Sequence, residues 1–293
     1  MSSATSLRIG FIGAGRVGTG LAWALAQKGC RISGVASRSE SAARTLAQGA
    51  TGCRVHASLQ QLADAADLVF LTVPDDAIAA VCAQVQWRTG QSVVHCSGAT
   101  DLDALAGAAA RRAQVGGFHP LLMFTEAASA ARALAGCAVA IEAEGALYQT
   151  LADLASMLGC HTLRVAPGMR ALYHAGASYV AAFVNALVRE ALGIWAPLGY
   201  SESEAIRALL PLLRGTADSI ERQGPVQGMA GAITRGDLGT VAKHVEALGK
   251  LDAQILELYC QLALRTVAIG IERGSLSPQQ AATLRALLGK PQA

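Results

Sequence analysis

Aromatic and charged side chains are scarce in this chain of 293 residues. Phe, Trp and Tyr make up 4% of it and Asp, Glu, Lys and Arg 15%, whereas 52% of the residues are hydrophobic. The formal net charge is only +3, and the sequence has neither a basic run nor a basic patch interleaved with aromatic residues. This composition predicts a large buried core and gives no reason to expect a nucleic acid as a partner.

Paired cysteine motifs are also missing. Seven cysteines are dispersed along the chain without a C-x-x-C pair, at positions 30, 53, 82, 96, 137, 160 and 260. An odd, scattered set of this kind is typical of reduced thiols rather than of a disulfide framework or a zinc site. We therefore expect no bound metal and a cytoplasmic location.

A membrane anchor is not expected either. Residues 1–6 are polar and contain no apolar signal region. The segment 169–188 is apolar enough to raise the question, but Arg170, His174 and Asn185 interrupt it. Such a segment fits a helix buried in the protein better than one that spans a bilayer.

What the chain does have is a glycine fingerprint near its start. The apolar run 7–12 leads into Gly13-Ala14-Gly15-Arg16-Val17-Gly18, and a helical pattern follows directly. The first glycine of such a motif makes a tight turn, the second lets the backbone approach a pyrophosphate, and the third lets helix and strand pack closely. Free amides and the macrodipole at the helix start bind the anion. These six residues predict a dinucleotide site; the alternative is a structural turn without a ligand.

The residues after the second expected strand indicate which dinucleotide is bound. That strand spans 31–36, and Ser37-Arg38-Ser39 follows it. A site for NAD would place an acid here to bind the ribose 2′-hydroxyl, whereas an arginine between serines suits a 2′-phosphate. The sequence therefore predicts NADP(H) as the cofactor. The alternative is that Arg38 is a solvated residue and that Glu40 turns toward the adenosine.

The pattern of apolar residues changes once along the chain. As far as residue 165, short strands alternate with amphipathic helical stretches, as in βαβ units around a parallel sheet. Long segments with helical periodicity follow, at 169–196, 202–220, 238–264 (with a break near Gly249) and 278–288. We expect an α/β Rossmann-like N-terminal domain with a mostly parallel sheet (residues 1–166). An all-α domain for substrate binding and dimerisation (residues 167–293) should follow it.

Ligands of such sheets bind outside the carboxyl ends of the strands, so residues that follow strands are candidates for the site. Val73 and Pro74 end the fourth expected strand, where Pro74 leaves the backbone close to a ribose or nicotinamide ring. Asp76 is expected to be a helix N-cap. Ser97 places a hydroxyl after the fifth strand. His119 ends the sixth and is the predicted general acid or base, because imidazole titrates near neutrality; the alternative is a histidine packed in a loop.

A second set of polar residues lies at the start of the helical part. In one continuous helix, His174 and Ser178 are i, i+4 neighbours and Asn185 follows about three turns later, so all three share one face. Polar groups on an apolar helix must be buried against partners or line a cleft. Both interpretations stay open: a cleft with catalytic His174 and Asn185, or a hydrogen-bonded packing or dimer contact.

Several motifs together resemble one protein family. Besides the glycine fingerprint they are Val73-Pro74-Asp75, His95-Cys96-Ser97-Gly98, Phe118-His119-Pro120, Tyr173-His174 and Arg235-Gly236-Asp237. Over nearly its whole length the chain resembles predicted NADP oxidoreductases of the 6-phosphogluconate dehydrogenase-like superfamily, which join a Rossmann-like domain to an all-helical C-terminal domain of unknown function. The resemblance implies a homodimer that associates through the helical domain.

Relatives in that superfamily suggest two different proton donors. Prephenate dehydrogenases use a His in a His-Pro step and a Ser roughly twenty residues earlier, which His119 and Ser97 resemble. β-Hydroxyacid dehydrogenases and ketopantoate reductases use a Lys with an Asn four residues later, and His174 and Ser178 hold those places here. Two histidines therefore compete for the role, and we favour His119.

The function that we expect is NADP(H)-dependent hydride transfer to or from a small carbonyl or hydroxy compound, for example a 2-oxo acid such as ketopantoate. An imine reductase of the pyrroline-carboxylate type is one alternative. A non-catalytic protein that senses NADP(H), in which the histidines only pack, is another.

Overall fold

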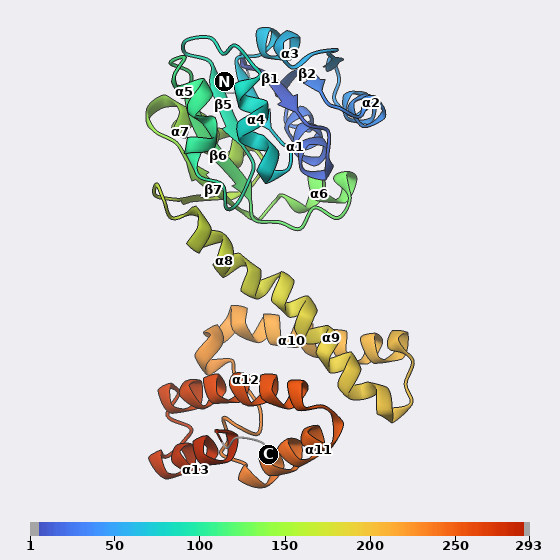
Figure 1. The fold of residues 1–293 in the computed structure, drawn as a ribbon, viewed down its shortest axis with the longest axis vertical. Coiled ribbons are helices and arrows are strands. Elements are labelled where there is room, and N and C mark those ends of the chain that lie inside the picture. The colour runs from blue at the N-terminus through green and yellow to red at the C-terminus, as the bar shows by residue number, and fades with distance from the viewer. Residues whose placement is uncertain (1–5, 290–293) are drawn as a thin grey trace. The chain divides into compact units, whose positions relative to one another are not determined.

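The computed structural model describes residues 6–289 and divides into two compact units, residues 1–182 and 183–293. The first unit contains a sheet and the helices that connect its strands (Figure 1). Its strands are β1 (Arg8–Ile12), β2 (Arg31–Ala36), β3 (Arg54–Val55), β4 (Leu68–Leu71), β5 (Ser92–His95), β6 (Gln114–Pro120), β7 (Ala138–Glu142) and β8 (His161–Arg164). Its helices are α1 (Arg16–Gln27), α2 (Glu40–Gln48), α3 (Leu59–Ala65), η2 (Asp75–Ala77), α4 (Ile78–Ala83), η3 (Leu102–Leu105), α5 (Ala106–Ala109), α6 (Ala127–Ala133), α7 (Gly145–Met157) and α8 (Arg170–Val180).

The strand order of the sheet is β3-β2-β1-β4-β5-β6-β7-β8. Neighbours run parallel from β3 to β6, β7 is antiparallel to β6, and β8 is parallel to β7. The mostly parallel sheet predicted from the sequence is thus confirmed. Because the carboxyl ends of β1 to β6 meet at one edge of the sheet, the loops that follow these strands converge there.

Both faces of the sheet are buried. Along β4, Leu68 and Phe70 pack on one face and Val69 and Leu71 on the other, and all four are 0% exposed. Side chains of α1, α2 and α7 complete the core on the first face, and those of α3, α4 and α5 complete it on the second. Burial on both faces explains why the strands are continuous apolar runs in the sequence.

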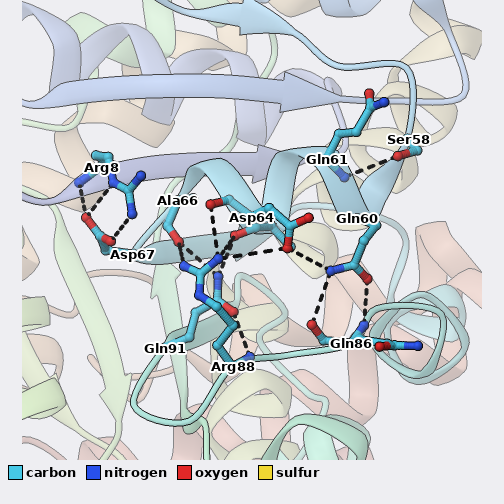
Figure 2. Close-up of polar contacts among 11 residues, drawn as sticks. Arg8, Ser58, Gln60, Gln61, Asp64, Ala66, Asp67, Gln86, Arg88 and Gln91 are labelled. Atoms are coloured by element: carbon cyan, nitrogen blue, oxygen red, sulfur yellow. Dashed lines mark hydrogen bonds and ion pairs between the residues drawn. The ribbon is translucent and has the colours of Figure 1, made fainter.

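At the amino ends of β1, β4 and β5, polar groups bind one another (Figure 2). Arg8 donates to the two carboxylate oxygens of Asp67 at 3.0 and 2.6 Å. Arg88 and Gln91 donate to backbone oxygens at the end of α3, at 2.7 to 3.3 Å. They satisfy carbonyl groups that a helix leaves without partners at its end.

Every regular element in the described part of the second unit is a helix. Its elements are α9 (Ala182–Trp195), η4 (Ala196–Leu198), α10 (Glu202–Gln227), α11 (Leu238–Leu251), α12 (Ala253–Glu272) and α13 (Pro278–Leu288). Buried apolar residues of α11, α12 and α13 form its core. Ser201 and Asp237 cap α10 and α11 by accepting from backbone amides. The predicted all-α C-terminal part is therefore confirmed.

The helix predicted over 169–196 is in fact two helices. Ala181 has φ −115° and ψ −82°, which is outside helical geometry, and it separates α8 from α9. The first unit continues to residue 182, beyond the predicted domain boundary after 166, because α8 packs on the sheet through Arg170. A second predicted helix, 238–264, is interrupted as expected near Gly249, with the break at Asp252.

Candidate functional site

The turn between β1 and α1 needs glycine at two of the three fingerprint positions. Gly13 has a φ of 101°, and a Cβ there would lie 2.6 Å from the backbone oxygen of Thr72. A Cβ on Gly18 would clash with the Thr72 hydroxyl and would lie 2.6 Å from the Gly13 oxygen. Thr72 donates that hydroxyl to the Gly13 oxygen at 2.8 Å. Gly18 thus lets α1 approach the end of β4.

The second fingerprint glycine, Gly15, faces open space. No atom lies within 4 Å of the position of its Cβ, and as N-cap of α1 it makes no side-chain bond. The helix bond from Thr19 N to Gly15 O, at 2.9 Å, leaves the amides of Arg16, Val17 and Gly18 without partners inside the helix. An anionic pyrophosphate fits such a helix start.

A pocket of about 810 Å³ opens at this turn. Seven of the predicted cofactor residues line it: Gly13, Ala14, Gly15, Ser37, Arg38, Val73 and Pro74. Its volume lies in the range typical of small-molecule and cofactor sites. Arg16, Val17, Gly18 and Ser39 are not among the residues that line it.

Two residues after β2, Ser37 and Arg38, line the pocket and are candidates for binding a 2′-phosphate. Ser39 accepts from Ala42 N at 3.2 Å as the N-cap of α2, and Glu40 pairs with Arg44 at 2.6 Å. The Ser39 side chain is therefore engaged within α2, and Glu40 forms an exposed i, i+4 ion pair on the same helix. Arg38 is exposed at the pocket wall, where its guanidinium can bind an anion.

His56 also lines this pocket, and the sequence did not single it out. Its ring occupies the space beside Gly34, where a Cβ would lie 2.5 Å from the imidazole. Burial, and then the charge of Arg54, lower the pKa of His56. Its Nε2 atom is buried without a hydrogen-bond partner. The only sequence signal was its position directly after a short strand.

A second group of residues gathers where β5 and β6 end. His119 Nδ1 lies 2.9 Å from the Tyr173 hydroxyl, and the His119 and His174 rings are 5.8 Å apart between centroids. A Cβ on Gly98 would lie 3.0 Å from the His119 ring and would clash with His174. The two histidines that competed in the sequence are therefore neighbours, and Gly98 makes room for both. We call His119, Tyr173 and His174 the histidine cluster.

The surroundings of His119 keep its imidazole neutral. Burial lowers the pKa of His119 to about 4, the charges of His174 and Arg170 act in the same direction, and Asp75 opposes them. Burial also raises the pKa of Tyr173, so its phenol keeps its proton. A phenol that donates to Nδ1 leaves the proton of a neutral imidazole on Nε2. Nε2–H is the donor that His119 can then offer to a ligand.

Ser97 does not offer a free hydroxyl to the histidine cluster. Its Oγ donates to Thr100 Oγ1 at 2.8 Å and accepts from Thr100 N at 3.0 Å, and the residue is buried. These bonds shape the turn after β5. His95, which the sequence did not propose, is buried beside it: its Nδ1 accepts from Ser97 N at 3.2 Å, and burial lowers its pKa to about 3.

A buried ion pair fastens α8 to the sheet. Arg170, 0% exposed, donates Nε to Glu142 Oε2 at 2.5 Å and Nη1 to the Ser97 carbonyl oxygen at 2.7 Å. Its guanidinium occupies the space over Gly117, where any Cβ would clash. Because the next turn of α8 carries the tyrosine and histidine of the cluster, this pair determines where they lie. Its only signal in the sequence is an arginine within an apolar segment.

Two expectations about these segments are wrong. His174 and Ser178 lie on α8, but Asn185 lies on α9 in the second unit, so the three do not share one helical face. Ser178 donates to the His174 carbonyl oxygen at 3.2 Å, a bond within α8. Asp76 is not an N-cap, because it lies inside η2 and α4 begins without a side-chain cap.

The arrangement supports hydrogen bonding and proton transfer by an imidazole and a phenol. Within residues 6–289, no group of three or more His, Cys, Asp or Glu side chains could hold a metal ion.

Two family models match the chain. A Rossmann-like domain matches residues 2–120, and a domain of unknown function, DUF2520, matches residues 137–266. The chain belongs to the proteins that join these two domains, the family of NADP oxidoreductases that its motifs resemble. A search of curated proteins found no match.

Solved structures share the fold over most of the chain. BF3122 from Bacteroides fragilis, described as an NADP oxidoreductase, is 25% identical with a TM-score of 0.71, covering 89% of this chain and 98% of that one. TM1727 from Thermotoga maritima is 21% identical with a TM-score of 0.72, covering 90% and 98%. A reductive aminase from Aspergillus terreus, solved with NADPH4, cyclohexanone and allyl amine, is 18% identical with a TM-score of 0.60, covering 97% and 92%. At their identities, the last two show likeness of fold alone.

Proposed function

We propose that this protein is an NADP(H)-dependent oxidoreductase that transfers hydride between the nicotinamide and a small carbonyl or hydroxy compound. The observation that carries the proposal is that the pocket at the glycine turn adjoins the histidine cluster in the first unit. The glycine-turn pocket includes Pro74, and the next residue, Asp75, acts electrostatically on His119 of the histidine cluster. The likeness to BF3122 supports the same class of reaction.

The residues of the pocket fit the parts of NADP(H). The amides at the start of α1 and the open space at Gly15 suit the pyrophosphate. Ser37 and Arg38 suit the 2′-phosphate, and Val73 and Pro74 line the side that leads to the histidine cluster. Bound there, the cofactor supplies or accepts the hydride.

His119 acts in this proposal as a neutral hydrogen-bond donor. With a pKa of about 4 it carries no charge at pH 7, so it does not protonate a substrate as an imidazolium. Its Nε2–H donates to the carbonyl oxygen and gives up the proton as hydride arrives. The Tyr173 hydroxyl, 2.9 Å from Nδ1, passes its own proton to that nitrogen and regains one from water, so that both groups end in their starting form. A neutral imidazole in such a role is a known way to polarise a carbonyl group.

The same observation favours reduction of an imine as the second candidate. A protonated imine brings its own proton and a positive charge, so it needs no acid from the protein. A neutral His119 does not repel such a cation, and the nearby Asp75 carboxylate attracts it, whereas the charge of Arg170 opposes this attraction. One of the solved neighbours is a reductive aminase, which agrees with this candidate at the level of the fold.

A substrate panel tests these functions. The full chain is mixed with NADPH and with 2-oxo acids, simple ketones, ketone and amine pairs, or cyclic imines, and NADPH oxidation is followed by absorbance. Oxidation with a carbonyl compound alone supports the first candidate, and oxidation only with imines or amine pairs supports the second. Tight binding of NADPH without oxidation by any member contradicts both and indicates a sensing protein.

We also propose that the protein is a homodimer that associates through its helical unit. No residue of α9 is buried, and several large apolar side chains of this unit are exposed: Phe183, Leu187, Leu198, Tyr200, Leu210, Leu212, Leu213 and Ile220. Apolar surface of this kind marks an interface. By length and composition, two helical stretches within the described residues, 170–198 and 253–272, could also cross a membrane.

Light scattering after size-exclusion chromatography without detergent separates the two possibilities. A dimer supports the proposal, whereas a monomer, or a chain that stays in solution only with detergent, contradicts it. A cytoplasmic location remains our prediction, in keeping with seven cysteines that are all free thiols.

A further inference from the structure

Two thiols lie side by side where β7 and β8 begin. Ala138 and His161 are paired residues of these parallel strands, and Cys137 and Cys160 immediately precede them. His161 N donates to the Cys137 carbonyl oxygen at 2.8 Å, which extends the strand pairing to the cysteines. The two Sγ atoms are 3.6 Å apart.

This geometry is compatible with a covalent bond. Neighbouring strands lie about 4.8 Å apart, and disulfides join Cα atoms separated by roughly 4.4 to 6.8 Å. Both thiols already point toward one another, so a small side-chain rotation closes the remaining distance. We propose that Cys137 and Cys160 are a redox-active dithiol that closes to an intramolecular disulfide when the protein meets a hydroperoxide.

The environments of the two thiols assign their roles. The contact with the Cys160 thiol, which also donates to the Leu134 carbonyl oxygen at 3.1 Å, lowers the pKa of Cys137, and Cys137 is only partly buried. The same contact between the thiols, together with burial, raises the pKa of Cys160. Since the thiolate is the nucleophile, Cys137 is the thiol that an oxidant meets first, and Cys160 is the resolving thiol.

The reaction proceeds in two balanced steps. The Cys137 thiolate attacks one peroxide oxygen, the O–O bond breaks, and the other oxygen leaves as an alcohol or water after taking a proton. Cys137 is then a sulfenic acid. The Cys160 sulfur attacks the Cys137 sulfur, the S–O bond breaks, and the hydroxyl leaves as water with the Cys160 proton. Two thiols have lost two electrons, which the hydroperoxide has accepted.

Cys53 provides a matched control. It is also partly buried and free, but burial raises its pKa to about 11. At neutral pH it therefore presents far less thiolate than Cys137. Replacement of Cys53 should leave closure of the pair unchanged.

Peptide mapping of the full chain tests the proposal. No Lys or Arg lies between Arg132 and Arg164, so trypsin releases residues 133–164, with both cysteines, as one peptide. After one equivalent of hydrogen peroxide, we expect that peptide to lose two hydrogens in mass and to resist alkylation, and a dithiol reductant to restore both thiols. Oxidation should also raise Tm by roughly 5–10 °C, because the bond closes a loop of some twenty residues.

Variants separate the pair from the other thiols. Cys137→Ser and Cys160→Ser should each abolish the protected peptide and the Tm shift, and Cys53→Ser should abolish neither. The proposal is overturned if peroxide leaves Cys137 and Cys160 alkylatable in the wild-type protein. It is equally overturned if Cys137 accumulates as sulfinic acid while Cys160 stays a free thiol. Neither outcome depends on whether the protein binds NADP(H).

Discussion

The amino and carboxyl edges of the sheet differ in whether their polar groups have hydrogen-bond partners. At the amino edge, Arg8 pairs with Asp67, and Arg88 and Gln91 satisfy backbone oxygens of α3 (Figure 2). At the carboxyl edge, buried polar atoms lack partners among the described residues; they include His56 Nε2, His95 Nε2 and Arg170 Nη2.

We infer that the polar groups of the amino edge stabilise the fold and that those of the carboxyl edge serve function. A buried donor or acceptor without a partner lowers stability by about 1–3 kcal/mol, so a fold retains few of them. Where several occur at one edge, beside a pocket and a histidine of lowered pKa, a ligand or a reaction is the expected reason for them. Four predictions test this contrast.

The largest effect is expected at the histidine cluster. His119→Ala should lower kcat by about 100- to 10,000-fold, because a proton-transfer group is lost, and should leave the Kd for NADPH unchanged. His174→Ala should likewise abolish turnover. His161→Ala, which removes an exposed histidine of β8, is the control. Steady-state kinetics and NADPH fluorescence measure the two effects, and full turnover in both cluster variants would refute the site.

The wild-type pH profile sharpens this prediction. His119 has a pKa of about 4, below the ordinary value of about 6.5, so it stays neutral as the pH falls from 7 to 5. The kcat/KM for a carbonyl substrate should therefore hold across that range and fall only toward pH 4. An apparent pKa near 6.5 that His119→Ala removes would contradict a neutral donor.

The buried ion pair should give the largest loss of stability. Glu142→Ala leaves the charge of Arg170 buried without its partner, which should lower the free energy of unfolding by about 3–5 kcal/mol. Glu144→Ala, two residues away and exposed, should change it by less than about 0.5 kcal/mol. Urea denaturation measures both. Equal effects would mean that the ion pair does not hold α8 on the sheet.

A smaller effect is expected at the pocket wall. Arg38→Ala should raise the KM for NADPH by about 10- to 100-fold and the KM for NADH little, because only NADPH has a 2′-phosphate to bind. Arg44→Ala is the matched control, since Arg44 lies nearby on α2 but pairs with Glu40. The same increase for both nucleotides would refute the assignment of Arg38.

The smallest effect is expected at the amino edge. Arg8→Ala should lower the free energy of unfolding at pH 7 by at most about 1 kcal/mol, because the ion pair with Asp67 is partly exposed, and should not alter kcat or KM. The bond from Arg8 lowers the pKa of Asp67. The pair therefore stabilises the fold above the ordinary carboxyl pKa of about 3.9, and this contribution is lost as the pH falls further.

Urea denaturation of Arg8→Ala and wild type at pH 7 and pH 3 measures this dependence. The difference between the two proteins should shrink at the lower pH. A marked change in kinetics in this variant would contradict the division between the two edges.

The strands were predictable because their signal is local. The range expected for β2, residues 31–36, is the one observed. Most of its residues are buried, as a strand covered on both faces of a parallel sheet requires. The helices α3 and α6 have seven residues each, which is too few to show clear helical periodicity in the sequence.

The site was predictable only in part. The glycine turn and Arg38 follow from neighbouring residues. The contact of His119 with Tyr173 spans 54 positions in the sequence and depends on how α8 docks on the sheet. The need for glycine at position 98 cannot be predicted from the sequence, because it arises only when both histidine rings pack against that residue. The error over Asn185 has a similar origin, because nothing near Ala181 in the sequence signals that the helix ends.

The amino-acid order alone specified the turn at Gly13, the parallel sheet and the helical second part. These features depend on backbone requirements and on the pattern of apolar residues, which are properties of short segments. Protonation and proximity depend on groups from several elements. Tertiary packing therefore decided that His119 is neutral, that it lies beside His174, and that Ser97 serves a turn. The cause is that burial and charge act through space, and the chain brings together residues that its order keeps far apart.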